Sequence, residues 1–187
     1  MIAYAFSFVF PYLLVLAVAL AAAARLGVDL RSARRRIALS AASLVIVLVP
    51  PWWIPVARWI VGVNANFSIP LTAILFAHVW RKLTGAELLD ERERLTAWVF
   101  GLAAGVALYP MALGLGRFDP YGLGWELSWA FVIFLAATVA FLYRRNRFGI
   151  VLVAAILAYD LGLLESPNLW DYFVDPFYAL AAAGTLA

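Results

Sequence analysis

The 187-residue sequence contains no cysteine and a single histidine, His78. Without cysteine the chain forms no disulfide bond and has no thiol nucleophile or thiolate metal ligand. One histidine does not supply the two or more nitrogen or sulfur ligands that haem and most catalytic transition metals require. We therefore expect no metal or other cofactor.

Charged residues are also scarce, at 13% of the chain, whereas 66% of the residues are hydrophobic. Soluble globular domains are about 25% charged and about half apolar. An apolar excess of this size cannot all be buried in so small a globule, so most of it is expected to face lipid. The expected main partner is the lipid bilayer. We expect no nucleic acid partner, because the net charge of +3 is explained by basic cytoplasmic loops.

The short motifs of common enzyme classes are missing as well. The sequence contains no GxSxG, no HExxH, no CxxC and no glycine-rich phosphate loop. This absence favours a protein without catalytic activity.

Charged residues divide the sequence into apolar stretches whose length is close to the thickness of a bilayer. A helix needs about 20 residues to cross the hydrocarbon core. The sequence therefore predicts an all-α integral membrane bundle of six transmembrane helices, in a single domain of residues 1–187, with a short half-helix in residues 176–187 at the outer face. The six predicted segments are Ala3 to Ala24, Arg36 to Arg58, Arg58 to Arg81, Thr96 to Gly116, Leu127 to Tyr143 and Phe148 to Leu164.

Arginine and lysine are unevenly distributed among the predicted loops. The loops after the first, third and fifth segments carry 12 of the 14 basic residues. Because cytoplasmic loops are enriched in these residues, we expect the three loops to be cytoplasmic and the N-terminus to lie outside a bacterial-type inner (plasma) membrane. No positive charge precedes Arg25, unlike in a signal peptide, so the first segment is expected to be retained.

Proline and glycine predict where helices break and where they approach closely. The stretch VPPWWIP (residues 49–55) is expected to break or kink the second segment, because proline lacks an amide donor. Pro70 and Pro110 fall inside the third and fourth segments. Gly101 and Gly105, four residues apart, would let another helix pack closely.

Asp160 lies inside the sixth segment, about 18 Å from its inner boundary at 1.5 Å per residue. A charged carboxylate in the outer half of the membrane costs on the order of 2.5–3.5 kcal/mol, so it must be paired, hydrated or protonated. Asp160 is either a functional acid or a packing residue that is protonated or bonded to Arg58 or Tyr109. Other polar residues at similar depth are expected to line one outward-opening pocket with it, suited to a hydrated cation, a proton, a sugar or a lipid headgroup: Asn64, Asn66, Tyr109 and Tyr159.

Further acids follow the fourth and sixth segments: Asp119, Glu126, Glu165, Asp171 and Asp175. An aspartate or serine directly before proline is typical of a helix N-cap. Asp119, Ser166 and Asp175 are therefore expected to begin short helices at the outer surface. The alternative is a Ca²⁺ or Mg²⁺ site, but the spacing matches no known cation-binding loop. The run DERER (residues 90–94) is expected to be a solvated helix start, with a partner-docking face as the alternative.

These features favour an accessory, scaffold or assembly subunit of a larger membrane complex, without catalysis and in contact with other integral membrane proteins. The alternative is a small transporter or substrate-binding subunit with its site at Asp160. A third hypothesis is an enzyme that acts on a lipid or polyprenyl headgroup, with Glu165, Asp171 or Asp175 as acid or base.

Overall fold

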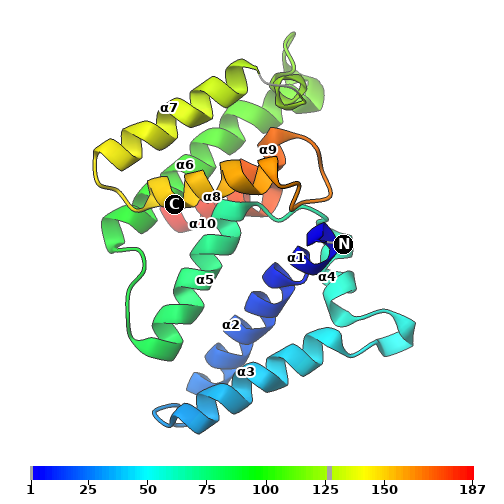
Figure 1. The fold of residues 1–187 in the computed structure, drawn as a ribbon, viewed down its shortest axis with the longest axis vertical. Coiled ribbons are helices and arrows are strands. Elements are labelled where there is room, and N and C mark those ends of the chain that lie inside the picture. Colours follow the sequence, from blue (N-terminus) through cyan, green and yellow to red (C-terminus); the bar gives the residue numbers. More distant parts are fainter. Residues whose placement is uncertain (1, 126–127) are drawn as a thin grey trace. The chain divides into compact units, whose positions relative to one another are not determined.

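A computed structural model describes residues 2–125 and 128–187 (Figure 1). Helices make up 76% of the structure, and these residues contain no strand, which confirms the all-α class. The chain divides into two compact units, which are described separately. Unit 1 comprises Met1–Ala65 and Leu75–Leu88, and unit 2 comprises Asn66–Ile74 and Leu89–Ala187.

Unit 1 is built around the pair α2 and α3, which pack against each other and lie closest near the loop that joins them (Figure 1). Its small core joins Leu16 and Leu20 of α2 to Val79 of α5. The elements of unit 1 are α1 (Ile2–Phe6), α2 (Val9–Arg25), α3 (Ala33–Leu48), η1 (Pro51–Trp53), α4 (Val56–Val63) and the second half of α5 (Ile69–Thr84).

Unit 2 has an aromatic core. The rings of Phe134 and Phe173 stack with centroids 4.0 Å apart, and Phe100 packs edge-on against Phe148 at 5.4 Å. The elements of unit 2 are the first turns of α5, α6 (Glu91–Pro110), the π-helical turn η2 (Met111–Leu115), η3 (Pro120–Gly124), α7 (Trp129–Tyr143), α8 (Phe148–Asp160), α9 (Leu169–Phe173) and α10 (Pro176–Leu186).

Two helical stretches are long and apolar enough to cross a membrane, Ile2–Arg25 and Glu91–Leu115. Only 28% and 17% of their apolar windows are buried within the chain. The other apolar helices are shorter: α7 has 15 residues and α8 has 13. At 1.5 Å per residue they reach roughly 20–23 Å, less than the approximately 30 Å of the hydrocarbon core. Two candidate spans are thus present, and the six-span bundle is not confirmed.

The second and third predicted segments are not continuous helices. α3 ends at Leu48, the chain turns through VPPWWIP, and α4 begins at Val56, where proline was expected to break the helix. The third segment also breaks, because residues 64–68 separate α4 from α5. Pro70 is the second residue of α5, not an internal kink, and its missing amide costs nothing in the first turn.

The close helix approach expected at Gly101 and Gly105 occurs within the chain. α10 packs along α6 in unit 2, and a Cβ added to Gly101 would lie 2.6 Å from the ring of Tyr178. A Cβ on Gly105 would lie 2.5 Å from that of Ala179. The Tyr178 hydroxyl donates to the Ala97 carbonyl on the same face of α6. The glycine pair therefore serves the chain's own C-terminal helix.

We predict that Gly101→Ala destabilises the protein by about 1–3 kcal/mol, because the new methyl group overpacks the contact with Tyr178. The measurement is thermal or denaturant unfolding of the purified protein in mild detergent. Gly184→Ala is the matched control, since a Cβ there meets no atom of the described chain within 4 Å and α10 should gain up to about 1 kcal/mol. Equal stability of the two variants would contradict the packing.

Candidate functional site

A network of hydrogen bonds joins the loops at one end of unit 2. The Tyr121 hydroxyl donates to Asp171 Oδ2 at 3.0 Å. Asn168 Nδ2 donates to the Tyr121 carbonyl, and Trp170 Nε1 donates to the Pro120 carbonyl. Burial and the neighbouring Asp171 carboxylate raise the pKa of Tyr121 to about 12, so this phenol stays protonated at neutral pH. The network fixes the loop after α6 to α9.

The segment between α8 and α9 is held from two sides. The Tyr172 hydroxyl accepts from the Leu164 amide and donates to the Ser166 carbonyl at 3.1 Å. Asn66, just before α5, accepts the Ser166 amide through Oδ1 at 3.1 Å. The polar side chain of Asn66 thus satisfies the backbone of a loop 100 residues away in the sequence.

Asp160 is the last residue of α8, and its side chain is exposed on the surface of unit 2. The helix ends there because Gly162 takes the left-handed conformation (φ 59°) and the Leu163 amide donates to the Ala158 carbonyl. A carboxylate at a helix C-terminus faces the negative end of the helix dipole and gains nothing from it. Helix capping therefore does not explain this aspartate.

Asp160 lines an open hollow of about 530 Å³ that lies entirely within unit 2. The hollow combines two carboxylates with the aromatic rings of Tyr159 and Tyr172, which meet edge-on at 5.3 Å. This donor set suits a cationic or hydroxyl-rich ligand. No group of three histidine, cysteine or acidic residues that could hold a metal occurs within residues 2–125 and 128–187. The lining residues are Tyr159, Asp160, Leu161, Gly162, Leu164, Glu165, Ser166, Pro167 and Tyr172.

Only part of the predicted pocket comes together in this hollow. Asp160 and Tyr159 line it, and Asn66 does not line it but accepts the amide of the lining residue Ser166. Tyr109 on α6 is not a lining residue and lies instead within electrostatic range of Asp171 and Asp175. The other two predicted residues, Arg58 and Asn64, belong to unit 1, where the Arg58 guanidinium lies over the ring of Tyr4 at 5.3 Å.

The helix starts predicted at Asp119 and Asp175 are confirmed. Asp119 accepts the Tyr121 amide at the start of η3, and Asp175 accepts the Phe177 and Tyr178 amides at the start of α10. The start predicted at Ser166 is wrong. α9 begins at Leu169 with Asn168 as its cap, and Ser166 instead accepts the Asn168 amide in the preceding turn. Glu126 lies outside the described residues.

Asp175 does more than cap α10. It is only 2% exposed, and its Oδ2 also accepts the Ser68 amide at 2.8 Å, which fastens the start of α5 to the start of α10. Burial raises the pKa of Asp175. Hydrogen bonds from Ser68 and from the two α10 amides act in the opposite direction and lower this pKa. The buried Ser68 hydroxyl has no hydrogen-bond partner at the usual distance and angle among the described residues. Asp175 therefore has a structural role in unit 2, where it connects the start of α5 to the start of α10.

A second buried carboxylate, Glu93, was not expected from the sequence. Glu93 is 4% exposed, and its Oε1 accepts both the amide and Nε of Arg147, at 2.9 and 3.0 Å. Its Oε2 accepts the Asp90 amide in a capping box. Glu91 and Arg92 are exposed, so the solvated helix start expected for DERER holds for them but is wrong for Glu93. The spacing of Asp90 and Glu93 was the available signal.

Comparison of the chain with protein-family models, with curated protein sequences and with solved structures finds no match in any of the three.

We predict that Asp175→Ala destabilises the protein by about 2–4 kcal/mol, because three backbone amides lose their acceptor and two elements lose their connection. The measurement is unfolding in mild detergent. Asp119→Ala is the control: its carboxylate is exposed, so the loss should stay near 0.5–1 kcal/mol.

The difference in unfolding free energy between the wild type and Asp175→Ala is expected to depend on pH. Burial raises the folded-state pKa of Asp175 above its ordinary value of 3.8. The protonation-linked part of the stability from this group is therefore fully present below pH 3.8 and is lost as the pH rises through the folded-state pKa, whereas its hydrogen bonds to the three amides remain. The difference in unfolding free energy between the wild type and Asp175→Ala should become smaller as the pH rises from 3.8 to the folded-state pKa. A gap that widens would contradict the raised pKa.

Proposed function

We propose that this chain is a multi-pass protein of a bacterial-type inner membrane and acts as a non-catalytic accessory, scaffold or assembly subunit of a membrane complex. The observation that carries the proposal is the large apolar surface that the chain leaves uncovered. On α7, Val132, Ile133 and Val139 are 49%, 62% and 56% exposed. Such contiguous apolar faces on soluble monomers are rare and mark membrane or protein contacts.

The lengths of the helices support contact with other membrane proteins. α7 and α8 are strongly apolar but too short to cross a bilayer of ordinary thickness alone. Short apolar helices are accommodated by local thinning of the bilayer or by oligomerisation. A subunit packed among longer helices of a partner meets this requirement.

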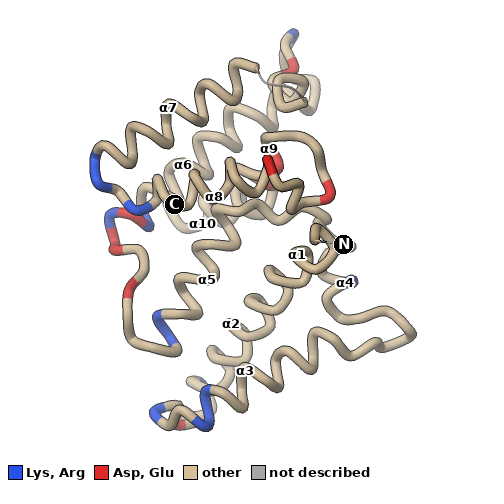
Figure 2. Tube along the Cα trace, in the orientation of Figure 1, with Lys and Arg blue, Asp and Glu red and all other residues tan. Residues whose placement is uncertain are grey.

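Two contacts support the proposed sidedness of the loops. In unit 1, Arg36 near the start of α3 donates to the Leu83 carbonyl at the end of α5, which joins two predicted cytoplasmic ends. In unit 2, Glu93 and Arg147 join the start of α6 to the α7–α8 turn, which are also predicted to be cytoplasmic. Figure 2 shows the basic residues gathered at the α2–α3 loop and, within unit 2, at the α7–α8 turn. Each contact connects loops that the basic-residue distribution assigns to the same side.

The hollow at Asp160 favours a second candidate function, the binding or transport of a small cationic or hydroxyl-rich ligand. It brings Asp160 and Glu165 to one open surface, although four of the predicted pocket residues do not line it. The enzymatic hypothesis receives less support. Of its three acids, Asp171 bonds to Tyr121 and Asp175 fastens α10 to α5, so two of them hold the fold.

The proposed orientation predicts the accessibility of single cysteines introduced into this cysteine-free chain. A cysteine at Ala33 should be protected from a membrane-impermeant maleimide in intact cells and become labelled only after lysis. A cysteine at Gly122 should be labelled in intact cells. The reverse pattern would contradict the orientation, and labelling of both in intact cells would contradict membrane crossing between them.

The proposed subunit role predicts protein neighbours at the exposed face of α7. A photo-crosslinking amino acid at Ile133 (62% exposed) should give adducts with another membrane protein in living cells. The same amino acid at Phe134 (4% exposed) is the control and should give none. If Ile133 captures only lipid, and the protein purifies in mild detergent as a monomer, the subunit role is wrong.

A further inference from the structure

We propose that a groove in unit 1 binds an anionic phospholipid of the cytoplasmic leaflet, with one acyl chain along the groove and the phosphate at Arg36. This inference rests on the membrane insertion proposed above but is independent of the subunit role. The groove has a volume of about 610 Å³ and is open along one side. Its residues come from α2, α3 and the end of α5: Tyr12, Ala33, Arg36, Ile37, Ser40, Ala41, Leu44, Leu83 and Thr84.

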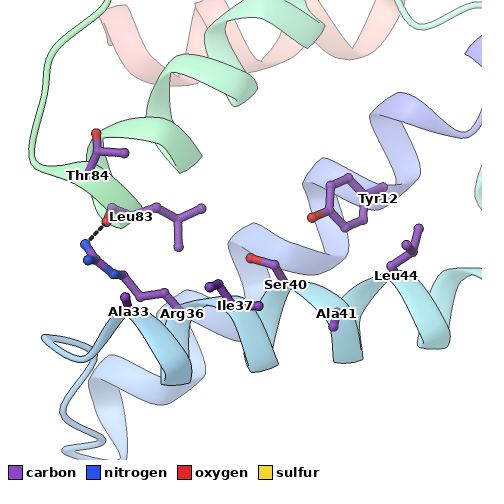
Figure 3. Close-up of a pocket in the computed structure, with 9 residues that line it drawn as sticks. All are labelled: Tyr12, Ala33, Arg36, Ile37, Ser40, Ala41, Leu44, Leu83 and Thr84. Atoms are coloured by element: carbon purple, nitrogen blue, oxygen red, sulfur yellow. Dashed lines mark hydrogen bonds between the residues drawn. The ribbon is translucent and has the colours of Figure 1, made fainter.

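The groove is mostly apolar, with the hydroxyl groups of Ser40 and Tyr12 along it, and is basic at one end (Figure 3). Ile37, Ala41 and Leu44 follow one another along α3, and the Tyr12 ring on α2 faces them. Arg36 lies at the far end, where α3 meets the end of α5. This order matches a phospholipid, whose apolar chain ends in a charged headgroup.

The Arg36 guanidinium is held in place at this end. It is half-buried, and its Nη1 donates to the Leu83 carbonyl, which carries the partial negative charge of the α5 C-terminus. A guanidinium has five N–H donors in a fixed planar fork that matches a phosphate group. The bond to Leu83 uses one nitrogen and orients the others, so Arg36 can bind a phosphate without losing its anchor.

The surrounding charge also favours an anion. Arg34, Arg35 and Arg36 lie in the first turn of α3, next to the positive end of the helix dipole, and Ser32 provides no side-chain cap there. Positive charge at a helix N-terminus is unfavourable, and a bound anion relieves it. In unit 1 the stretch from the end of α2 to the first turn of α3, and the end of α5 with the residues that follow it, carry only two acids, Asp29 and Glu87. The same segments carry seven basic residues: Arg25, Arg31, Arg34, Arg35, Arg36, Arg81 and Lys82. Basic pockets between membrane helices on the cytoplasmic side bind anionic headgroups.

A free anion would not explain the rest of the groove. Inorganic phosphate or a detached headgroup would contact Arg36 and leave the surface of Ile37, Ala41 and Leu44 uncovered. An acyl chain covers that surface through van der Waals packing, which a headgroup alone does not provide. The chemistry of the two ends together therefore specifies a lipid.

The test is native mass spectrometry of the delipidated full-length protein titrated with phosphatidylglycerol or phosphatidylcholine in mild detergent. Phosphatidylglycerol should bind at least tenfold more tightly. Arg36→Gln should weaken it tenfold or more. Arg34→Gln removes the same charge from an exposed position of the same helix turn and should weaken binding by at most about fivefold. Equal affinity for the two lipids, or an equal loss in the two variants, would overturn the proposal.

A second pair of variants tests the groove without touching the charge. Ala41→Phe should fill the groove and reduce phosphatidylglycerol binding at least tenfold. Ala42→Phe places the same side chain on the neighbouring face of α3, in a different hollow, and should leave binding within twofold. An equal loss in both overturns the assignment to this groove, as does equally tight binding of glycerophosphoglycerol, which lacks acyl chains. Failure of membrane insertion would appear separately, in the cysteine labelling.

Discussion

The organisation of unit 2 depends on the need to pair the backbone amides and carbonyls that its fold buries. In an apolar surrounding each unpaired group costs several kcal/mol. Unit 2 meets this need with its few polar side chains. Asp175 accepts three amides from two elements, Asn66 accepts one from a distant loop, and Asn168 caps α9 while donating to the Tyr121 carbonyl. These side chains are hydrogen-bonded within the fold.

The acids fall into two groups according to whether the fold uses them as hydrogen-bond acceptors. Asp171, Asp175 and Glu93 are bonded to the chain's own donors, whereas Asp160 lies exposed at the end of a helix whose dipole does not favour it. A carboxylate kept in such a position is a candidate for contact with something outside the chain. This distinction is sharper than sequence position, which groups all the outer acids together.

The sequence predicted the local features that depend on a few neighbouring residues. Asp-Pro pairs correctly marked the starts of η3 and α10, and residues 49–55 correctly marked a break. Features that depend on distant partners were missed. Ser166 precedes a proline as Asp175 does, but Asn168 lies nearer the start of α9 and Ser166 is held by Asn66. Glu93 resembled a surface residue because its partner Arg147 is 54 residues away. Helix length was overestimated for the second, third and sixth segments, because charges mark the ends of apolar stretches, whereas prolines and turns mark the ends of helices.

The first turn of α3 shows how the fold of unit 1 and its surroundings depend on each other. Three arginines at a helix N-terminus without a side-chain cap destabilise that turn in isolation. Arg36 recovers part of this cost by bonding to the α5 C-terminus, where positive charge is favourable. Arg35 donates to the Asp29 carbonyl and Arg34 is exposed, and in the proposed orientation the anionic cytoplasmic leaflet would supply negative charge to both. The positive-inside distribution of arginine would then orient the chain and, by the same interaction, stabilise the helix that carries it. An anionic lipid in the neighbouring groove would bring that negative charge to a defined position.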